Sequence, residues 1–323
     1  MTDVMTQPSA SEPAMAAARR LRVQELTLPF VLVALVIAGA VIDSDVFLTK
    51  DNLLTVLTQA SVVGVVAIGM TFVIATGGID LSVGSMLAAA AIAGGQFEPS
   101  GSGAFIAGTL GFAVLLGLVN GLAISWGRIV PFIATLAMLT VARGLALWMS
   151  DKTPISLTFL DTVRSLGRDE VVGVPVPAFV FVAVAAIGWV VLNRTRYGRH
   201  VVAVGGNREA ARIAGIKPNR VVCSVYVLSG LCVGIAAVLL SGRLGSASPV
   251  AGSLLELDAI AAVVIGGTSL AGGRATVVGT FLGVVTFALI FNLLNLLEMP
   301  AEIQQITRGL IILAAAAIQR RDR

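Results

Sequence analysis

Charge, histidine and cysteine are scarce in this sequence. Only 12% of its 323 residues are Asp, Glu, Lys or Arg, and it contains one histidine and two cysteines. It has no GxxxxGK[ST] phosphate loop, no HExxH motif and no CxxC pair, so an ATPase, a metalloenzyme and a histidine-dependent hydrolase are all poorly supported. We therefore expect a chain that is not an enzyme, binds no metal or cofactor of its own and has no nucleic-acid partner.

Apolar residues, by contrast, make up 57% of the chain and come in long blocks. The blocks are apolar around the whole circumference of a helix, which is required of a segment that faces lipid or other buried helices. They lack the alternation of apolar and polar residues that the strands of a transmembrane barrel need. The sequence therefore predicts an all-α fold, a polytopic transmembrane helical bundle.

About ten transmembrane helices are expected. Two of the apolar segments, 80–97 and 254–270, are short and broken by glycine, so each also fits a half-helix that re-enters the membrane. Eight full spans is then the alternative. The predicted spans are 27–43, 53–75, 80–97, 103–126, 132–149, 177–193, 221–242, 254–270, 274–296 and 302–318.

Lys and Arg lie mostly on one side of these spans. If the amino terminus is cytoplasmic, that side holds 15 of the 22 basic residues, seven of them between Arg194 and Arg220. The positive-inside rule therefore places both termini in the cytoplasm. We interpret residues 1–25 as a disordered cytoplasmic tail, 26–318 as a single transmembrane domain, and 319–323 as a short cytoplasmic tail.

The segment 194–220 is basic, lies between apolar spans, and has glycines at positions that suit a turn and a helix end. Gly205–Gly206 permits a turn, Asn207 is a suitable amino-terminal cap for a helix through Ala214, and Gly215 suits its carboxyl-terminal cap. Two interpretations are open. The segment is either a membrane-surface loop that obeys the positive-inside rule or a helix that fits a cleft on a cytoplasmic partner.

A second glycine-marked feature is the string TGGIDLSVGS at 76–85. Its glycines interrupt two apolar runs, and Asp80 and Ser82 place polar groups at the same break. A charged residue at membrane depth is costly unless it is paired, so Asp80 either caps the following helix or takes part in a translocation path. The candidate residues at this break are Gly77, Gly78, Asp80, Ser82 and Gly84.

The pattern GGxxLxxG of the first break recurs at 266–273, although in a chain with 35 glycines chance is an alternative explanation. If the repeat is real, the two breaks frame one pathway. Neutral polar residues in or near the spans suit a hydroxylated solute, but hydrogen bonding between helices is their commoner use. The further candidates are Gly266, Gly267 and Gly273 at the second break, and Asn120, Asn292 and Asn295 as polar lining.

Two strings resemble a known family. Glu209-Ala210-Ala211, followed by Gly215, is similar to the EAA loop of permease subunits in bacterial ABC importers. Residues 76–85 are similar to the signature of the branch that carries ribose, xylose, arabinose and galactose, and the likeness runs from about residue 25 onward. The resemblance implies that the loop helix docks into a groove on a separate ATPase subunit. The coupling residues would be Asn207, Arg208, Glu209, Ala210, Ala211, Arg212 and Gly215.

The resemblance also implies a location and partners. It places the chain in the bacterial inner membrane as a multi-pass permease for a monosaccharide or a similar neutral polyhydroxy solute. A second permease copy would complete a homodimer, the partner ATPase would use ATP and Mg²⁺, and a solute-binding protein would deliver cargo at the outer face.

An ion-coupled secondary transporter of a small polar solute is the alternative function. Such a protein needs several buried ionisable groups, and few charges fall within the predicted spans, which counts against proton coupling. The main ones are Asp80, Arg143 and Arg308, with Glu256, Asp258, Glu298 and Glu302 near the outer ends of their spans.

Overall fold

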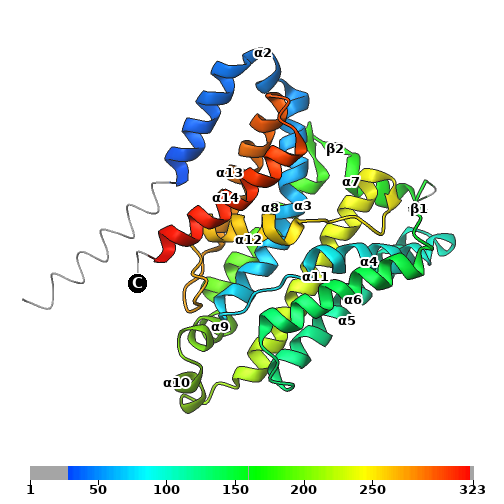
Figure 1. The fold of residues 1–323 in the computed structure, drawn as a ribbon. Helices are drawn as coiled ribbons and strands as arrows, with labels where there is room; N and C mark the ends of the chain where they lie inside the picture. Colours follow the sequence, from blue (N-terminus) through cyan, green and yellow to red (C-terminus); the bar gives the residue numbers. More distant parts are fainter. Residues whose placement is uncertain (1–27, 159, 321–323) are drawn as a thin grey trace, which may run out of the picture.

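The computed structural model describes residues 28–158 and 160–320 (Figure 1). The expected disordered tail, 1–25, lies outside these residues, as do positions 321–323 of the expected carboxyl-terminal tail. Most of the described chain is helical, and its four strands are two residues long each. The predicted all-α bundle is confirmed.

Each predicted span has a helix at its place. Six helices of the described chain, α3, α5, α6, α8, α11 and α13, are long and apolar enough to cross a membrane. The helices at the predicted spans are Leu28–Ile42, α3 (Lys50–Ala75), α4 (Val83–Gly95), α5 (Ser102–Ser125), α6 (Pro131–Met149), α8 (Val176–Arg194), α11 (Pro218–Leu244), α12 (Leu255–Ile265), α13 (Val277–Leu296) and α14 (Ala301–Arg320).

The connections contain further short elements that the sequence alone did not predict. Residues 194–220 hold two helices where one was expected. The strands form two small antiparallel pairs, β1 with β4 and β2 with β3. The elements are α2 (Ser44–Phe47), η1 (Glu98–Ser100), β1 (Ile155–Ser156), α7 (Asp161–Arg168), β2 (Glu170–Val171), β3 (Val174–Pro175), α9 (Arg196–Gly206), α10 (Arg208–Ile213) and β4 (Ser246–Ala247).

Local sequence signals set several helix ends. The Thr49 hydroxyl accepts the Asn52 N–H at 3.3 Å and caps α3, and the Thr276 hydroxyl caps α13 in the same way by accepting the N–H of Gly279 at 3.1 Å. Gly245 ends α11 with φ +71°, a left-handed conformation that glycine adopts without steric cost.

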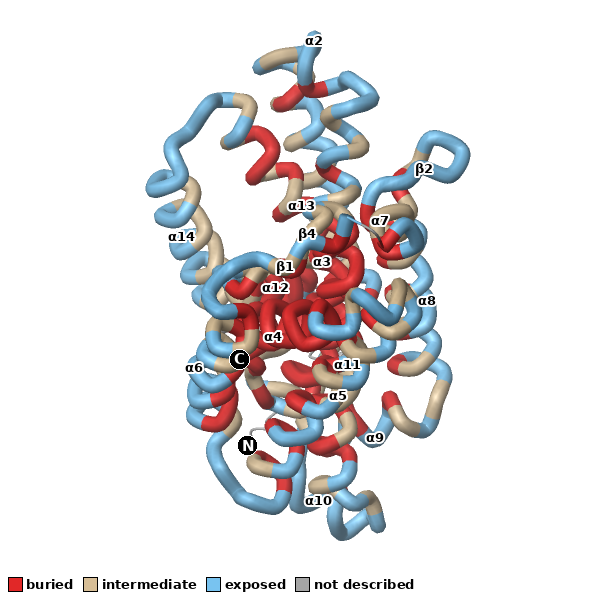
Figure 2. The backbone as a smooth tube through the Cα atoms, turned by 90° about the vertical axis from the view of Figure 1, so that its right-hand side faces the viewer, coloured by how far each residue is buried: buried red, intermediate tan, exposed pale blue. Residues whose placement is uncertain are grey.

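Two of the helices are half-helices. With 13 residues in α4 and 11 in α12, neither reaches across a hydrocarbon core of about 30 Å at about 1.5 Å per residue. Every residue of α4 is buried, and Figure 2 shows the buried backbone concentrated around α3, α4, α11 and α12. The re-entrant alternative is wrong, because each half-helix continues an irregular stretch of chain, and the two together pass from one end of the bundle to the other: Gly77 lies beside Gly272, and Gly95 lies beside Ile155.

The connections gather at two opposite ends of the bundle. At one end Ile155 of β1 pairs with Ala247 of β4, and Lys50 Nζ lies 3.1 Å from Glu170 Oε2. At the other end the N–H of Gly273 donates to the carbonyl of Ala75 at 3.0 Å. This grouping agrees with the alternation of spans predicted from the sequence.

Glycine allows close helix packing in the core, above all between α5 and α11, the pair with the most extensive contact. A Cβ on Gly117 would lie 2.5 Å from the carbonyl oxygen of Tyr226, and one on Gly121 would lie 2.8 Å from that of Cys223. Since these neighbours are backbone atoms, no side-chain movement relieves the overlap. Both cysteines, Cys223 and Cys232, are free and buried in α11, as apolar packing residues are expected to be.

Candidate functional site

The short helix α10 projects from one end of the bundle (Figure 1). Asn207 caps it, because its side-chain oxygen accepts the N–H of Ala210 at 2.9 Å. After the helix, Gly215 has φ +83°, and the N–H of Ile216 donates back to the carbonyl of Ala211 at 3.0 Å. This is the glycine-ended closure typical of helix termini. The predicted short helix is present with both of its predicted caps.

The residues of α10 differ in what they face. Arg212 binds Glu209 on the solvent side, with Nε 3.0 Å from Oε2, and these hydrogen bonds hold the pKa of the Glu209 carboxyl below its usual value. Ala211 is 4% exposed and packs against the protein itself, whereas Ile213 is 78% exposed. Ile213 is thus the large apolar side chain that α10 presents to solvent. Sequence reasoning missed Ile213, although it is the one large apolar side chain in α10.

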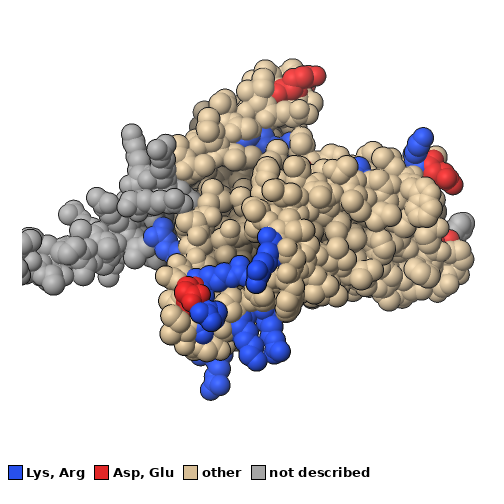
Figure 3. Space-filling model, turned by 60° about the horizontal axis from the view of Figure 1, so that its bottom comes forward, with Lys and Arg blue, Asp and Glu red and all other residues tan. Residues whose placement is uncertain are grey.

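Basic side chains surround this helix. All seven Lys and Arg residues of segment 194–220 are exposed, and Figure 3 shows Lys and Arg gathered on the face that carries the α9 and α10 end of the molecule. Interspersed acidic groups are few there. The loop therefore presents a positive surface around α10.

The glycine pair before α10 is not the turn that the sequence predicted. Gly205 and Gly206 are the last two residues of α9. A Cβ on Gly205 would lie 1.8 Å from the carbonyl oxygen of Ala75 and 2.6 Å from the nitrogen of Gly273. The turn prediction was wrong because glycine is needed here for contact between backbones. The helix that leads to α10 thus lies directly against the end of α3 and the loop after α12.

The first break starts with a regular helix end. Gly77 has φ +79°, its N–H donates to Ile74 at 2.9 Å, and that of Gly78 donates to Val73 at 3.2 Å. Residues 78–82 follow before α4 begins at Val83, and the last two of them, Leu81 and Ser82, form a turn. Because α3 and α4 run in opposite directions from this point, the glycines make the reversal possible.

Asp80 lies within the first break and is fully buried. Its Oδ1 accepts two hydrogen bonds from Ser82, at 3.0 Å from the backbone nitrogen and 2.5 Å from the hydroxyl, and its Oδ2 accepts from the Ser229 hydroxyl at 3.4 Å. Asn120 donates to the same Ser82 hydroxyl at 2.9 Å. Asp80 therefore binds the N–H of the residue just before α4 and holds the break against α5 and α11.

The second break ends its helix in the same way. Gly267 has φ +85°, its N–H donates to Val264 at 3.0 Å, and that of Thr268 donates to Val263 at 3.2 Å. Gly267 is thus the counterpart of Gly77, a shift of one residue from the pairing that the GGxxLxxG echo predicted. The sequence echo therefore aligns glycines that stand at different positions of the two helix ends. What the two breaks share is the way in which the backbone hydrogen bonds close the end of the helix.

The two breaks also contact each other. A Cβ on Gly272 would lie 2.8 Å from the nitrogen of Gly77 and 2.9 Å from the carbonyl oxygen of Gly205. We call Gly77, Gly205, Gly272 and the adjoining Ala75 carbonyl the glycine junction. In this junction the element that leads to α10 meets both broken helices.

The remaining polar candidates join helices to one another. Asn292 and Asn52 exchange hydrogen bonds between their side chains, at 2.6 and 3.2 Å, and thereby link α13 to α3. Asn295 is exposed and accepts from Gln304 at 2.9 Å. Asn120 is buried against Ser82. None of the three lines the hollow described next, and their role in lining a path stays a prediction.

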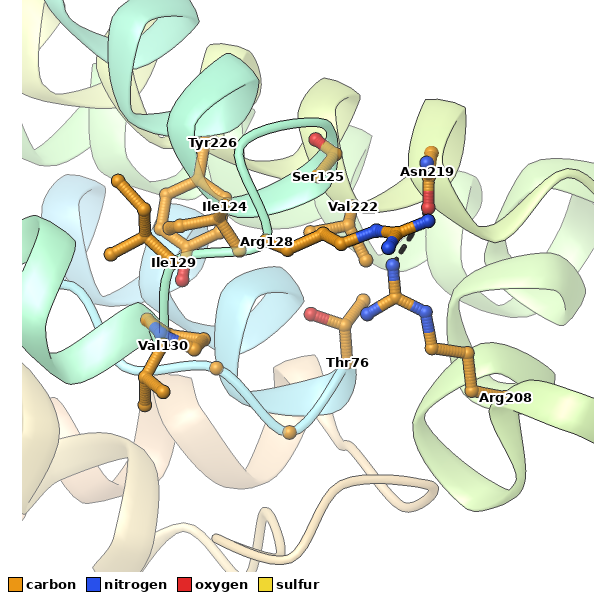
Figure 4. A pocket seen from close by; sticks show the side chains of 13 residues that line it. Thr76, Ile124, Ser125, Arg128, Ile129, Val130, Arg208, Asn219, Val222 and Tyr226 are labelled. Carbon is orange, nitrogen blue, oxygen red and sulfur yellow. Dashed lines mark hydrogen bonds between the residues drawn. The ribbon is translucent and has the colours of Figure 1, made fainter.

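A hollow of about 570 Å³ opens beside α10 and extends to the first break (Figure 4). Arg128 and Arg208 reach toward each other across it, and Arg208 donates to the Asn219 side chain at 2.8 Å. Among the residues that the structure describes, its lining contains no carboxylate. The hollow connects the basic end to the glycine break through Thr76, Gly77, Gly78, Ile124, Ser125, Arg128, Ile129, Val130, Pro131, Arg208, Asn219, Val222 and Tyr226.

Comparison with known proteins agrees with this geometry. The family described as branched-chain amino acid transport system / permease component matches residues 52–316. The chain belongs to this family. The permease is similar to the ribose import permease protein RbsC of Bacillus subtilis, with 45% identity over 299 residues that cover 91% of this chain and 92% of the relative.

Other relatives cover the permease to the same extent. RbsC of Escherichia coli K12 is 39% identical over 297 residues, 89% of this chain and 92% of its own. The D-allose transport system permease protein AlsC of the same strain is 34% identical over 294 residues, 90% of each chain. No solved structure matches the permease. The predicted resemblance to sugar permeases of ABC importers is confirmed. The permease is a membrane transport subunit and not an enzyme.

Proposed function

We propose that this permease forms the path by which an ATP-driven importer carries a monosaccharide, ribose or a close relative, into the cell. The observation that carries the proposal is α10, a doubly capped helix that exposes Ile213 and adjoins both broken helices through the glycine junction. The substrate class is supported by relatives that are named for ribose import, D-allose transport and fructose import.

The coupling step follows from the contacts of α9 and α10. An ATPase subunit binds α10 and uses ATP and Mg²⁺ of its own. Movement of α10 displaces α9, and the backbone contact of Gly205 with Ala75 and Gly273 passes that displacement to both breaks. Because interfaces between packed backbones resist compression, small shifts at the docking helix change the relative position of the half-helices.

The proposed assembly has two copies of this permease, and a sugar-binding protein at the end opposite α10. A cytoplasmic position for the α10 end is supported by the exposed Lys and Arg residues of 194–220, and with an even number of predicted spans both termini lie in the cytoplasm in this proposal. Membership of a transport system whose relatives include a probable ABC transporter permease favours ATP over an ion gradient as the energy source.

Uptake into vesicles tests the substrate class. The permease is reconstituted with its ATPase and binding protein, and labelled ribose, xylose, arabinose, galactose and allose are compared at equal concentrations. We expect ATP-dependent uptake of at least one of these sugars, lost in Glu209→Ala and Gly215→Pro. Uptake of an amino acid but of no sugar would overturn the proposal, because the family name also covers branched-chain amino acid systems.

A further inference from the structure

Glu256 lies where the two half-helices begin against each other, and it is only partly buried. A Cβ on Gly84, in the first turn of α4, would lie 2.2 Å from the carbonyl oxygen of Gly252 and 2.6 Å from Glu256 Oε2. From this point α4 runs to the end that holds β1, since Gly95 packs against Ile155. In the other direction α12 runs to the glycine junction. Glu256 is therefore about midway between the two ends of the molecule.

Four charged side chains from three helices meet near this point. Arg143 of α6 donates from Nη1 to the carbonyls of Pro249 at 2.6 Å and Ala251 at 3.1 Å. Asp258 of α12 and Arg308 of α14 form an ion pair at 2.5 Å. Glu256 lies within the electrostatic field of both arginines. The sequence showed these charges only as isolated residues, and the fold brings them into one cluster with no net charge.

Glu256 and Arg143 are left available by this arrangement. Both side chains are partly exposed, and among the described residues no cation lies within ion-pair distance of Glu256. The preceding chain is irregular, with φ +68° at Gly252 and +67° at Leu254. Irregular backbone and unpaired charge at membrane depth persist only where protein or a water-filled cavity surrounds them. Lipid is therefore excluded as the neighbour of this face.

We propose that Glu256 and Arg143 bind the sugar within the translocation path, an inference that rests on the proposed function. The Glu256 carboxylate accepts hydrogen bonds from adjacent hydroxyls, and the guanidinium of Arg143, held by Pro249 and Ala251, donates to sugar oxygens. Both are charge-assisted bonds, the stronger class. Zero net charge in the cluster suits a neutral polyhydroxylated solute. The Asp258–Arg308 pair fixes the start of α12 and positions Glu256.

Two measurements on the permease with its ATPase and binding protein test this site. Glu256→Gln and Arg143→Gln should each lower ATP-driven sugar uptake about ten-fold or more, because bonds to charged groups are lost, while ATP hydrolysis stimulated by the loaded binding protein persists. Glu302→Gln removes an exposed carboxylate at the start of α14 and should leave uptake unchanged. If the wild type takes up sugar and both cluster variants do so equally well, the proposed sugar site is wrong but the proposed function stands. No uptake by the wild type would overturn the proposed function.

The second measurement leaves the cluster intact. Ser253→Cys places a thiol at an exposed position three residues before Glu256, and Val141→Cys places one on α6 on its exposed apolar face. A charged, membrane-impermeant thiol reagent should modify Ser253→Cys and not Val141→Cys, and excess sugar with binding protein should slow that modification. Equal labelling with and without sugar, or no labelling of Ser253→Cys, would contradict a sugar site there even if the charge variants fail to assemble.

Discussion

The backbone N–H of Gly273 donates a hydrogen bond to the carbonyl oxygen of Ala75 at 3.0 Å. These residues lie almost 200 positions apart, one at the end of α3 and the other in the loop after α12. The bond joins the two helix breaks at the place where Gly205 of α9 also packs. In the proposed function, this junction passes movement of α10 to both half-helices.

Gly205→Ala tests the glycine junction. The added methyl group would lie 1.8 Å from the Ala75 carbonyl oxygen, so α9 must move away from α3. We expect sugar uptake to fall while the ATPase still binds. Gly206→Ala is the matched control, because its methyl group meets nothing closer than 3.8 Å. Equal uptake by the two variants, measured in the same vesicles with ATP hydrolysis, would show that the junction does not transmit movement.

Asp80 should contribute to stability mainly as a hydrogen-bond acceptor. Asp80→Ala leaves the buried N–H and hydroxyl of Ser82 without their acceptor, which costs about 1–3 kcal/mol. Asp80→Asn keeps one acceptor oxygen, so its free energy of unfolding should fall by less. Thermal unfolding in detergent measures both, with Ser229→Ala as a control that removes only the longest bond. If Asp80→Asn is as unstable and inactive as Asp80→Ala, the negative charge itself is required.

Gly84→Ala should destabilise the contact between the half-helices. Its methyl group would lie 2.2 Å from the Gly252 carbonyl oxygen, and overpacking of this kind costs about 1–3 kcal/mol. Gly144→Ala, in α6, has open space around the new methyl group. Because the substitution lowers the entropy of the unfolded chain, it should raise the free energy of unfolding by about 0.5–1 kcal/mol. Melting temperatures that move in the same direction for both variants would contradict the close approach of α4 and α12.

Ile213→Asp should weaken binding of the ATPase. Ile213 is the exposed apolar side chain of α10, and a carboxylate buried at an interface without a partner is costly. Val172→Asp is the control, since Val172 is 96% exposed near the opposite end of the molecule. We expect co-purification of the ATPase to drop for Ile213→Asp only. If both variants retain the ATPase, its docking surface is not on α10.

The Glu209–Arg212 pair gives a pH dependence with a defined sign. Arg212 lowers the pKa of Glu209 in the folded helix, so the pair is fully formed above the unfolded pKa of about 4.3 and is lost as pH falls through the lower folded value. After correction for intrinsic exchange rates, the backbone amides of α10 should be protected from hydrogen exchange to the same degree from about pH 6 to 9. Glu209→Gln should reduce that protection at neutral pH. Unchanged protection would show that the two caps suffice.

Much of the fold followed from the sequence because its signals are local. The apolar blocks gave the positions of ten helices, and Asn207 and Gly215 gave both ends of α10, since caps depend only on neighbouring residues. The role of Gly205 was misread because a glycine needed for close packing resembles one needed for a turn. The cluster of Arg143, Glu256, Asp258 and Arg308 could not be foreseen, because the rotation of an apolar helix about its axis is not encoded in its composition.

The most direct test of the central claim is the energy source of transport. Sealed vesicles containing the permease and its ATPase receive labelled ribose with the binding protein, and contain either ATP and Mg²⁺ or no nucleotide and an imposed proton or sodium gradient. The proposed function predicts uptake only with ATP, accompanied by ATP hydrolysis and abolished by Glu209→Ala with Gly215→Pro. Uptake that follows the ion gradient without nucleotide would contradict it and identify a secondary transporter.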